Sequence, residues 1–293
     1  MKRTVFLAAL ILAIFPLACA RAQESLRVSD VIYGKKLGVA LTMDVFQPAK
    51  PSGIGVLWMV SGGWVSRHEN ISPELAKAFT DRGITVFEVV HGSQPKFTVS
   101  EIAQDIHRAV RFVRTNAAKY GVDPERLGIS GGSAGGHLSL LIAATGGPGD
   151  PAAKDPVDRA SSAVQAAGVF YPPTDFRNYG KDGQHAMTNP LLKGYWPAFG
   201  ITDATTAEEK LKIETALSSI PRMTASMPPT LMIHGDADFL VPLQQSRLVE
   251  ARLTELKVPV KLIVKPGKGH GWTDMAPDLA MVADWFTKYL AKK

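Results

Sequence analysis

The strongest constraint on the fold is the repeated alternation of short apolar runs with segments of helical periodicity. A continuous apolar run, typical of a strand buried on both faces, occupies residues 54–60, and residues 84–90 are expected to form the next strand. Apolar residues recur at helical spacing in residues 73–82, and again in a later segment that Ser100 is expected to cap. Because strands that alternate with helices form parallel sheets covered on both faces, the pattern predicts an α/β fold.

The expected sheet is mostly parallel and eight-stranded, and it begins with a hairpin at residues 26–33 and 39–46. One segment, from about residue 172 to 226, breaks the alternation. It is long, aromatic and punctuated by Pro and Gly, as in "YPPTDFRNYG". Connections of this length inside a compact domain are usually functional, so we expect a lid-like insertion within one domain that covers residues 23–293.

The first 22 residues have the layout of a secretory signal peptide. Lys2 and Arg3 precede an apolar run at residues 5–17, and small residues follow it. The run is short for a bilayer, so we expect a secreted or periplasmic protein with no integral membrane span in the mature chain. Anchoring as a lipoprotein through Cys19 is the alternative. Since Cys19 is the only cysteine, the mature chain is expected to use no thiol chemistry.

The charge distribution argues against a nucleic-acid partner. The formal net charge is +6, and removal of Lys2 and Arg3 lowers it by two, to +4. The basic residues are scattered along the chain, which is typical of solvated faces. The histidines have no spacing that suggests a metal site, so we expect neither a metal nor an organic cofactor.

The stretch "GISGGSAGGHLSL", residues 128–140, places glycines and serines where a strand turns into a helix. It matches G-x-S-x-G twice, around Ser130 and around Ser133. A serine nucleophile needs a tight turn that projects its hydroxyl and neighbours without side chains. Ser133 meets both needs, because Gly131 and Gly135 flank it and the helical pattern starts directly after it. We therefore interpret Ser130 as a strand residue and Ser139 as a packing residue of the helix.

A reactive serine needs a base that takes its proton and an acid that fixes the tautomer of the base. Two later turns offer these groups, "HGDADFLVP" at residues 234–242 and "PGKGHGW" at residues 266–272. Each follows a strand, and the carboxyl ends of parallel strands meet at one sheet edge. The chain therefore predicts a triad of Ser133, Asp238 and His270, with Asp236 as the alternative acid.

With these motifs the sequence resembles the α/β-hydrolase superfamily, in particular secreted esterase/lipase and prolyl-oligopeptidase-like catalytic domains. The family pattern H-G-x-x-D-x-x-V-P falls on "HGDADFLVP" and implies Asp238, rather than Asp236, as the acid. The pattern G-x-x-H-G falls on "GKGHG" and implies His270 as the base. The resemblance covers nearly the whole chain after the first 22 residues, and it implies an α/β-hydrolase fold.

An acyl-transfer enzyme also needs N–H donors for the negative charge that develops on the carbonyl oxygen. The backbone N–H of Ala134, directly after the nucleophile, is one expected donor. Related esterases carry H-G-G-G-W in the loop that gives the others, and this chain reads "VSGGW". Gly62 and Gly63 are retained as expected donors, whereas Val60 and Ser61 replace the family's histidine and first glycine. The departure leaves open how this loop is held.

These features predict a serine hydrolase that cleaves carboxylic esters through an acyl-enzyme. Its expected substrate is a small-molecule or polysaccharide-borne ester. One alternative is a serine peptidase of prolyl-oligopeptidase type, although such enzymes generally carry an N-terminal propeller and this chain starts its core after a short hairpin. A second alternative, which the change at Val60 and Ser61 suggests, is a non-catalytic binding protein on a hydrolase scaffold.

Overall fold

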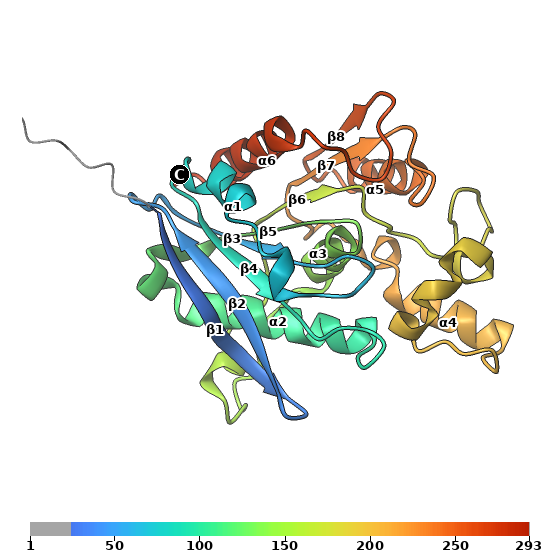
Figure 1. The fold of residues 1–293 in the computed structure, drawn as a ribbon, viewed down its shortest axis with the longest axis horizontal. Coiled ribbons are helices and arrows are strands. Elements are labelled where there is room, and N and C mark those ends of the chain that lie inside the picture. The colour runs from blue at the N-terminus through green and yellow to red at the C-terminus, as the bar shows by residue number, and fades with distance from the viewer. Residues whose placement is uncertain (1–24, 293) are drawn as a thin grey trace, which may run out of the picture.

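Eight strands form a single sheet in the computed structural model, which describes residues 25–292 (Figure 1). The expected signal peptide and Cys19 lie outside these residues. The spatial order is β1-β2-β4-β3-β5-β6-β7-β8. The strands are β1 (Leu26–Lys36), β2 (Val39–Gln47), β3 (Gly53–Met59), β4 (Thr85–Val90), β5 (Val122–Gly132), β6 (Ala166–Phe170), β7 (Thr230–Gly235) and β8 (Val260–Lys265).

The sheet is mostly parallel, which confirms the fold predicted from the alternation of strands and helices. Only β2 runs against the others, since it pairs antiparallel with both β1 and β4 while the remaining neighbours are parallel. Every residue of β6 and β7 is buried. Strands covered on both faces carry mainly apolar side chains, and the buried polar residues of β7, Thr230 and His234, are hydrogen-bonded.

Helices cover both faces of the sheet. Helices α1 and α6 pack with one core cluster, and α2, α3 and α5 pack with the other, on the opposite face (Figure 1). The expected cap at Ser100 is wrong, because Thr98 precedes the helix and forms a capping box with Glu101. The helices are α1 (Pro73–Thr80), α2 (Val99–Thr115), α3 (Ala134–Thr145), α4 (Ala207–Leu217), α5 (Gln244–Glu255) and α6 (Ala276–Tyr289).

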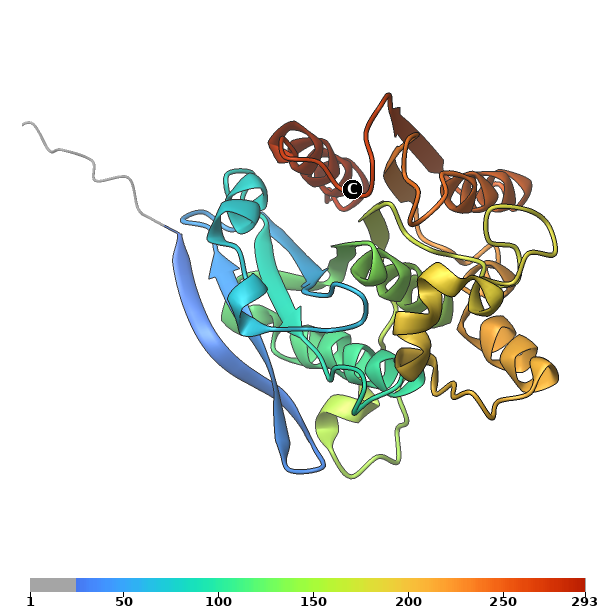
Figure 2. The same cartoon turned by 45° about the vertical axis from the view of Figure 1, so that its right-hand side comes forward.

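The connection between β6 and β7, residues 171–229, is the longest excursion from the sheet. It contains the 3-10 segments η4 (Ala186–Thr188), η5 (Pro190–Phe199) and η6 (Ile220–Arg222), together with α4. Figure 2 shows this β6–β7 connection, in yellow and orange, beside the green helix α3. In the described part of the chain, no helix has the length and apolar character that crossing a bilayer requires.

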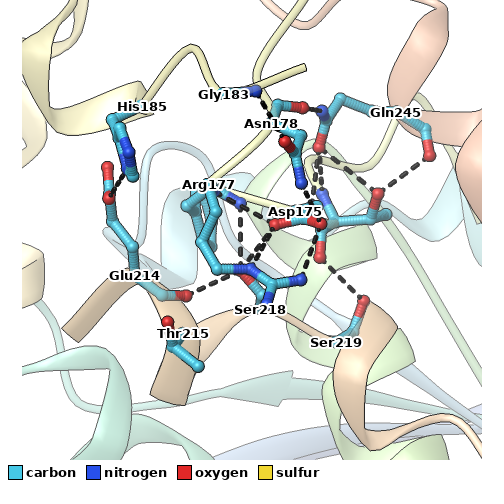
Figure 3. Close-up of polar contacts among 12 residues, drawn as sticks. Asp175, Arg177, Asn178, Gly183, His185, Glu214, Thr215, Ser218, Ser219 and Gln245 are labelled. Carbon is cyan, nitrogen blue, oxygen red and sulfur yellow. Dashed lines mark hydrogen bonds and ion pairs between the residues drawn. The ribbon is translucent and has the colours of Figure 1, made fainter. Parts of the chain in front are cut away.

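The β6–β7 connection is fastened to α5 and to itself by buried polar groups (Figure 3). The Gln245 Oε1 atom accepts hydrogen bonds from the backbone N–H groups of Thr174 and Asp175, both at 2.8 Å. The buried Asp175 carboxylate also accepts two hydrogen bonds of 2.9 Å from the Arg177 guanidinium. Because buried charges are costly unless paired, this network defines where the connection leaves the sheet.

Candidate active site

Ser133 lies on a strained turn between β5 and α3. Its φ of 53° and ψ of −121° are rare for a residue with a side chain, and such strain is typical of functional sites. A Cβ atom on Gly131 would lie 2.7 Å from the carbonyl carbon of Gly135, and one on Gly135 would lie 2.7 Å from the Met59 oxygen. Both flanking glycines are therefore required for the close approach of strand and helix.

The other two serines of the stretch are already hydrogen-bonded within the fold. Ser130 is fully buried in β5, and its Oγ donates to the Gly168 carbonyl at 2.6 Å. Ser139 is buried in α3, and its Oγ donates to the Gly135 carbonyl at 2.8 Å. Neither hydroxyl faces an imidazole, in contrast to that of Ser133.

His270 lies between the Ser133 hydroxyl and the Asp238 carboxylate. Its Nε2 atom is 2.7 Å from Ser133 Oγ, and its Nδ1 atom is 2.7 Å from Asp238 Oδ2. The carboxylate can only accept, so Nδ1 carries a proton and Nε2 is free to accept the proton of the hydroxyl. The structure thus brings together three side chains that lie after β5, β7 and β8.

Asp238 is buried but well supplied with donors. Its Oδ1 accepts from the backbone N–H groups of Leu240 and Val241, at 3.0 and 2.9 Å. Burial alone would raise the pKa of Asp238, but hydrogen bonds from His234, His270 and the Val241 N–H outweigh it and hold that pKa well below its usual range. The carboxylate is therefore ionised beside His270 at neutral pH.

Asp236 has a different position from Asp238. Its side chain is exposed, and its Oδ1 accepts from the Gly267 N–H at 2.7 Å. A Cβ atom on Gly235 would lie 2.1 Å from the Lys268 carbonyl oxygen, so the loops after β7 and β8 are in direct backbone contact. Asp236 closes this contact between the loops and lies outside the Ser133–His270–Asp238 hydrogen bonds.

The loop after β3, residues 60–67 and here called the β3 loop, approaches Ser133 from β3. In residues 25–292 the N–H groups of Gly63 and Ala134 have no hydrogen-bond acceptor. The Gly62 N–H differs from the expectation, because it donates to the Val65 carbonyl at 3.0 Å. Gly63 has a φ of +56° and Trp64 one of +61°, so the loop is held in a conformation that few side chains tolerate.

Residues of the loop after β4 hold the β3 loop, and the sequence analysis did not identify them. The Gln94 side chain donates to the Gly63 carbonyl at 2.8 Å, and the Gln94 N–H donates to the Trp64 carbonyl at 3.2 Å. Ser66 N–H donates to Ser93 Oγ at 2.8 Å. The only signal in the sequence was the polar cluster "HGSQP" that follows a buried strand.

Two hollows meet at Ser133. The first, with an empty volume of about 380 Å³, is walled by aromatic and aliphatic side chains, Phe176 and Phe199 among them. The second is more open, has a volume of about 900 Å³, and is lined by polar groups as well, including Asn70 and His270. Tyr195, from η5, borders both hollows, as do Gly63 and Leu240. The site therefore offers a narrow apolar chamber on one side of Ser133 and a wide mixed cleft on the other.

Tyr171 forms part of the wall of the open cleft. It follows β6 with a φ of +35°, which is a strained value for a bulky residue. Its ring centroid is 4.8 Å from that of His270 in an edge-on arrangement. Burial, assisted by the Asp238 charge, raises the pKa of Tyr171 to about 12, so its hydroxyl stays protonated at neutral pH.

A group of side chains with metal-binding chemistry lies apart from Ser133. Ligand atoms of Asp30, Asp44 and His68 lie within 4.8 Å of one another. However, Arg27 pairs with the Asp44 carboxylate at 2.7 Å, and the Thr42 hydroxyl lies 3.0 Å from His68 Nε2. A guanidinium beside the central carboxylate opposes a cation by charge, so we assign no metal to this group.

The doubly covered sheet, the strained serine turn and the loops that meet beside it define an α/β-hydrolase. The chain belongs to the BD-FAE family, whose model matches residues 43–253. Among curated proteins it is similar to "Probable carboxylic ester hydrolase LipM" of Mycobacterium tuberculosis, with 30% identity over 83% of this chain and 56% of that protein. Esterase LipQ of the same organism is 28% identical over 80% and 53% of the two chains. The chain thus spans about half the length of these relatives.

Solved structures of esterases share the fold. A truncated form of a carbohydrate esterase from gut microbiota superposes with a TM-score of 0.76 at 25% identity, over 93% of this chain and 99% of that chain. Est2 of Thermogutta terrifontis, with propionate bound, has a TM-score of 0.69 at 25% identity, over 93% and 97% of the two chains. These likenesses confirm the α/β-hydrolase fold that the motifs imply.

Proposed function

We propose that this chain is a carboxylic ester hydrolase that works through an acyl-enzyme on Ser133. The proposal rests on one observation, the continuous chain of 2.7 Å contacts from Ser133 through His270 to Asp238. A hydroxyl becomes a good nucleophile only when a base is in hydrogen-bond reach and a third group orients that base. Membership of the BD-FAE family and the likeness to named esterases support the same activity.

In this mechanism His270 Nε2 takes the hydroxyl proton while Ser133 Oγ attacks the acyl carbon of the ester. The developing oxyanion accepts hydrogen bonds from the N–H groups of Gly63 and Ala134. The Gly62 N–H is engaged with Val65, so we assign no role to it in this step. When the tetrahedral intermediate collapses, the imidazolium donates its proton to the departing alcohol and leaves an acyl-Ser133 ester.

Deacylation repeats the sequence with water as the nucleophile. His270 takes a proton from water, and the resulting hydroxide attacks the acyl carbon. The acid is released as Ser133 recovers its proton. Asp238, kept ionised by its donors, stabilises the imidazolium in both halves of the cycle. Each preset N–H donor in such a hole is worth about 3 kcal/mol of barrier.

We assign the acyl group to the narrow aromatic chamber and the alcohol to the open cleft. The chamber's apolar walls suit a short aliphatic acyl group, and the cleft's polar lining suits a hydroxyl-rich alcohol. The gut-microbiota protein named as a carbohydrate esterase and the Est2 structure with propionate bound support this class of substrate. The proposed substrates are esters of small acids with polar alcohols, including carbohydrate-borne esters.

Two measurements test the proposal, namely hydrolysis of 4-nitrophenyl acetate and covalent labelling by a fluorophosphonate, with the labelled residue located by mass spectrometry. We expect Ser133→Ala to abolish both. The matched control is Ser139→Ala, a nearby serine that faces away from His270, and it should retain both. Retained turnover in Ser133→Ala, or a label on a different residue, would refute the assignment.

Substitutions of the two aspartates show which of them is the acid of the triad. Asp238→Asn removes the charge beside His270 and should lower kcat by about 10³- to 10⁴-fold. Asp236→Asn keeps an oxygen that accepts from the Gly267 N–H, and its kcat should stay within a few-fold of the parent's kcat. Faster turnover of X-Pro anilides than of aryl esters would instead favour a peptidase.

A further inference from the structure

We propose that His137 is a positioning residue that fixes the β3 loop through Trp64 and ties it to the β6–β7 connection at Leu217. His137 thereby sets the position of the Gly63 N–H relative to Ser133. The inference rests on the proposed function, because it assigns Gly63 as an oxyanion donor. Val60 stands in place of the family's histidine, and His137 adds to the hold that Gln94 and Ser93 have on this loop.

The hydrogen bonds of His137 run in one direction. Trp64 Nε1, which can only donate, lies 3.1 Å from His137 Nδ1. His137 Nε2 lies 2.8 Å from the Leu217 carbonyl oxygen, which can only accept. The proton must therefore be on Nε2, and Nδ1 must be the acceptor. The neutral tautomer protonated on Nε2 satisfies both hydrogen bonds of the imidazole, and no other protonation state does.

The three residues of this hydrogen-bonded series, Trp64, His137 and Leu217, are all buried, so water does not replace a lost hydrogen-bond partner. The exposed fractions are 5% for Trp64, 0% for His137 and 5% for Leu217. Leu217 is the last residue of α4, where a carbonyl has no partner inside its helix. His137 supplies that partner from α3. An unpaired group at any of these places would carry the full cost of desolvation.

His137 lies on the helical turn that begins at the nucleophile, and it is hydrogen-bonded to the nucleophile's backbone. It lies one helical turn after Ser133, and its N–H donates to the Ser133 carbonyl at 2.9 Å. The indole that it holds belongs to the residue directly after Gly63. One turn of α3 therefore positions both the attacking hydroxyl and the loop that carries the opposing donor.

Aromatic contacts also restrict the position of the Trp64 indole. The Trp64 ring meets Phe199 edge-on at a centroid distance of 5.0 Å, and Tyr195 at 5.6 Å. His137 meets Phe176 at 5.1 Å. Phe176, Tyr195 and Phe199 all belong to the β6–β7 connection, so a change in that connection reaches the β3 loop through both packing and hydrogen bonds.

His137 is not itself a catalytic base in this arrangement. Both ring nitrogens are engaged, and His137 is not among the described residues that line either hollow at Ser133. Burial lowers the pKa of His137 to about 4, so the imidazole remains neutral while the enzyme works. Its effect on the reaction must therefore pass through the groups that it positions, the β3 loop above all.

The test compares steady-state kinetics and inhibition by an aryl trifluoromethyl ketone, an analogue of the tetrahedral intermediate, for several full-length variants. Trp64→Phe keeps an aromatic ring at this buried position and removes the N–H donor together with the second ring of the indole. His137→Leu removes both hydrogen bonds, and His137→Gln returns one donor and one acceptor. We expect kcat to fall about 10- to 100-fold in Trp64→Phe and His137→Leu, with KM within about threefold, because a misplaced donor weakens the transition state.

In Trp64→Phe and His137→Leu the inhibitor constant should rise by about the same factor as kcat falls. His137→Gln should recover part of the lost kcat and part of the lost inhibitor affinity. The double variant Trp64→Phe/His137→Leu should lose no more kcat than the worse of the two single variants, since both changes break the same series of hydrogen bonds. His107→Gln is the matched control. It replaces another histidine that accepts and donates within the fold but lies on α2, and it should lower the thermal midpoint without changing kcat.

The outcomes separate this inference from the function on which it rests. If the parent enzyme hydrolyses esters and labels at Ser133 while folded Trp64→Phe keeps the parent's kcat and inhibitor constant, the positioning role is overturned and the function stands. If the parent neither turns over esters nor labels, the function fails first. Should His137→Leu fail to fold, Trp64→Phe and ¹⁵N chemical shifts of the His137 ring still decide, because the inference requires the Nε2-protonated tautomer.

Discussion

Glu88 offers a sharp test of the electrostatics of this fold. Its side chain is fully buried on β4, where Oε2 accepts from the Ser72 N–H at 2.8 Å. In the described residues Oε1 has no hydrogen-bond partner. Burial is the main cause that raises the pKa of Glu88, and the Asp44 charge adds to it. The Ser72 hydrogen bond and Arg27 oppose it, and the resulting pKa is about 8.

The sign of the stability effect follows from this raised pKa. In the unfolded chain Glu88 loses its proton near its ordinary pKa of 4.5, while in the folded chain it keeps the proton up to about pH 8. The contribution to stability is complete below pH 4.5 and is lost as the pH rises through this window. A tenfold difference in proton affinity corresponds to about 1.4 kcal/mol, so the free energy of unfolding should fall by about 4 kcal/mol between pH 4.5 and 8.

Glu88→Gln removes the titration and keeps an oxygen for the Ser72 N–H. Urea unfolding of the parent and the variant at pH 5, 6, 7 and 8 should show a difference that grows in favour of the variant by about 1 kcal/mol per pH unit. The exposed Glu69→Gln is the matched control and should show no such trend. Parallel pH profiles for Glu88→Gln and the parent would refute the reasoning.

Three further changes test the packing around the site. Gly131→Ala places a Cβ against the Gly135 backbone and should lower kcat/KM for 4-nitrophenyl acetate at least about 100-fold. Tyr195→Ala removes a ring that lines both hollows, so the chamber should admit longer acyl groups and the butyrate-to-acetate ratio of kcat/KM should rise about 10-fold. Lys265→Met leaves the buried Asp278 carboxylate, which otherwise bonds Lys265 at 2.8 Å, without its cation. The free energy of unfolding in urea should fall by about 3 kcal/mol.

The sheet could be predicted because its signals are local. A strand covered on both faces is mainly apolar, so β3 is visible as a run, and the glycines around Ser133 mark the turn. The start of α2 was less accessible, since Ser100 and Thr98 are both good caps. Glu101 settles the choice, because its carboxylate accepts from the Thr98 N–H at 2.8 Å.

Hydrogen bonds between distant segments account for what the sequence analysis missed at the site. Motif spacing brought Ser133, Asp238 and His270 to one sheet edge, but it gave no information on the Gly62 N–H, which the turn to Val65 engages. The contact from Trp64 to His137 joins residues 73 positions apart. No local pattern encodes such a contact, because it depends on how the β3 loop and α3 are placed by the completed sheet.

The β6–β7 connection has a consequence for how the proposed hydrolase can evolve. None of Ser133, Asp238 and His270 belongs to residues 171–229, yet that segment builds most of the chamber wall. Under the proposed function, most of the chamber that selects the acyl group is therefore encoded apart from the three residues that cleave the bond. We expect exchange of this segment between homologues to redirect the proposed hydrolase to new esters, provided that the graft still presents the Thr174 contact to Gln245 and the helix end at Leu217.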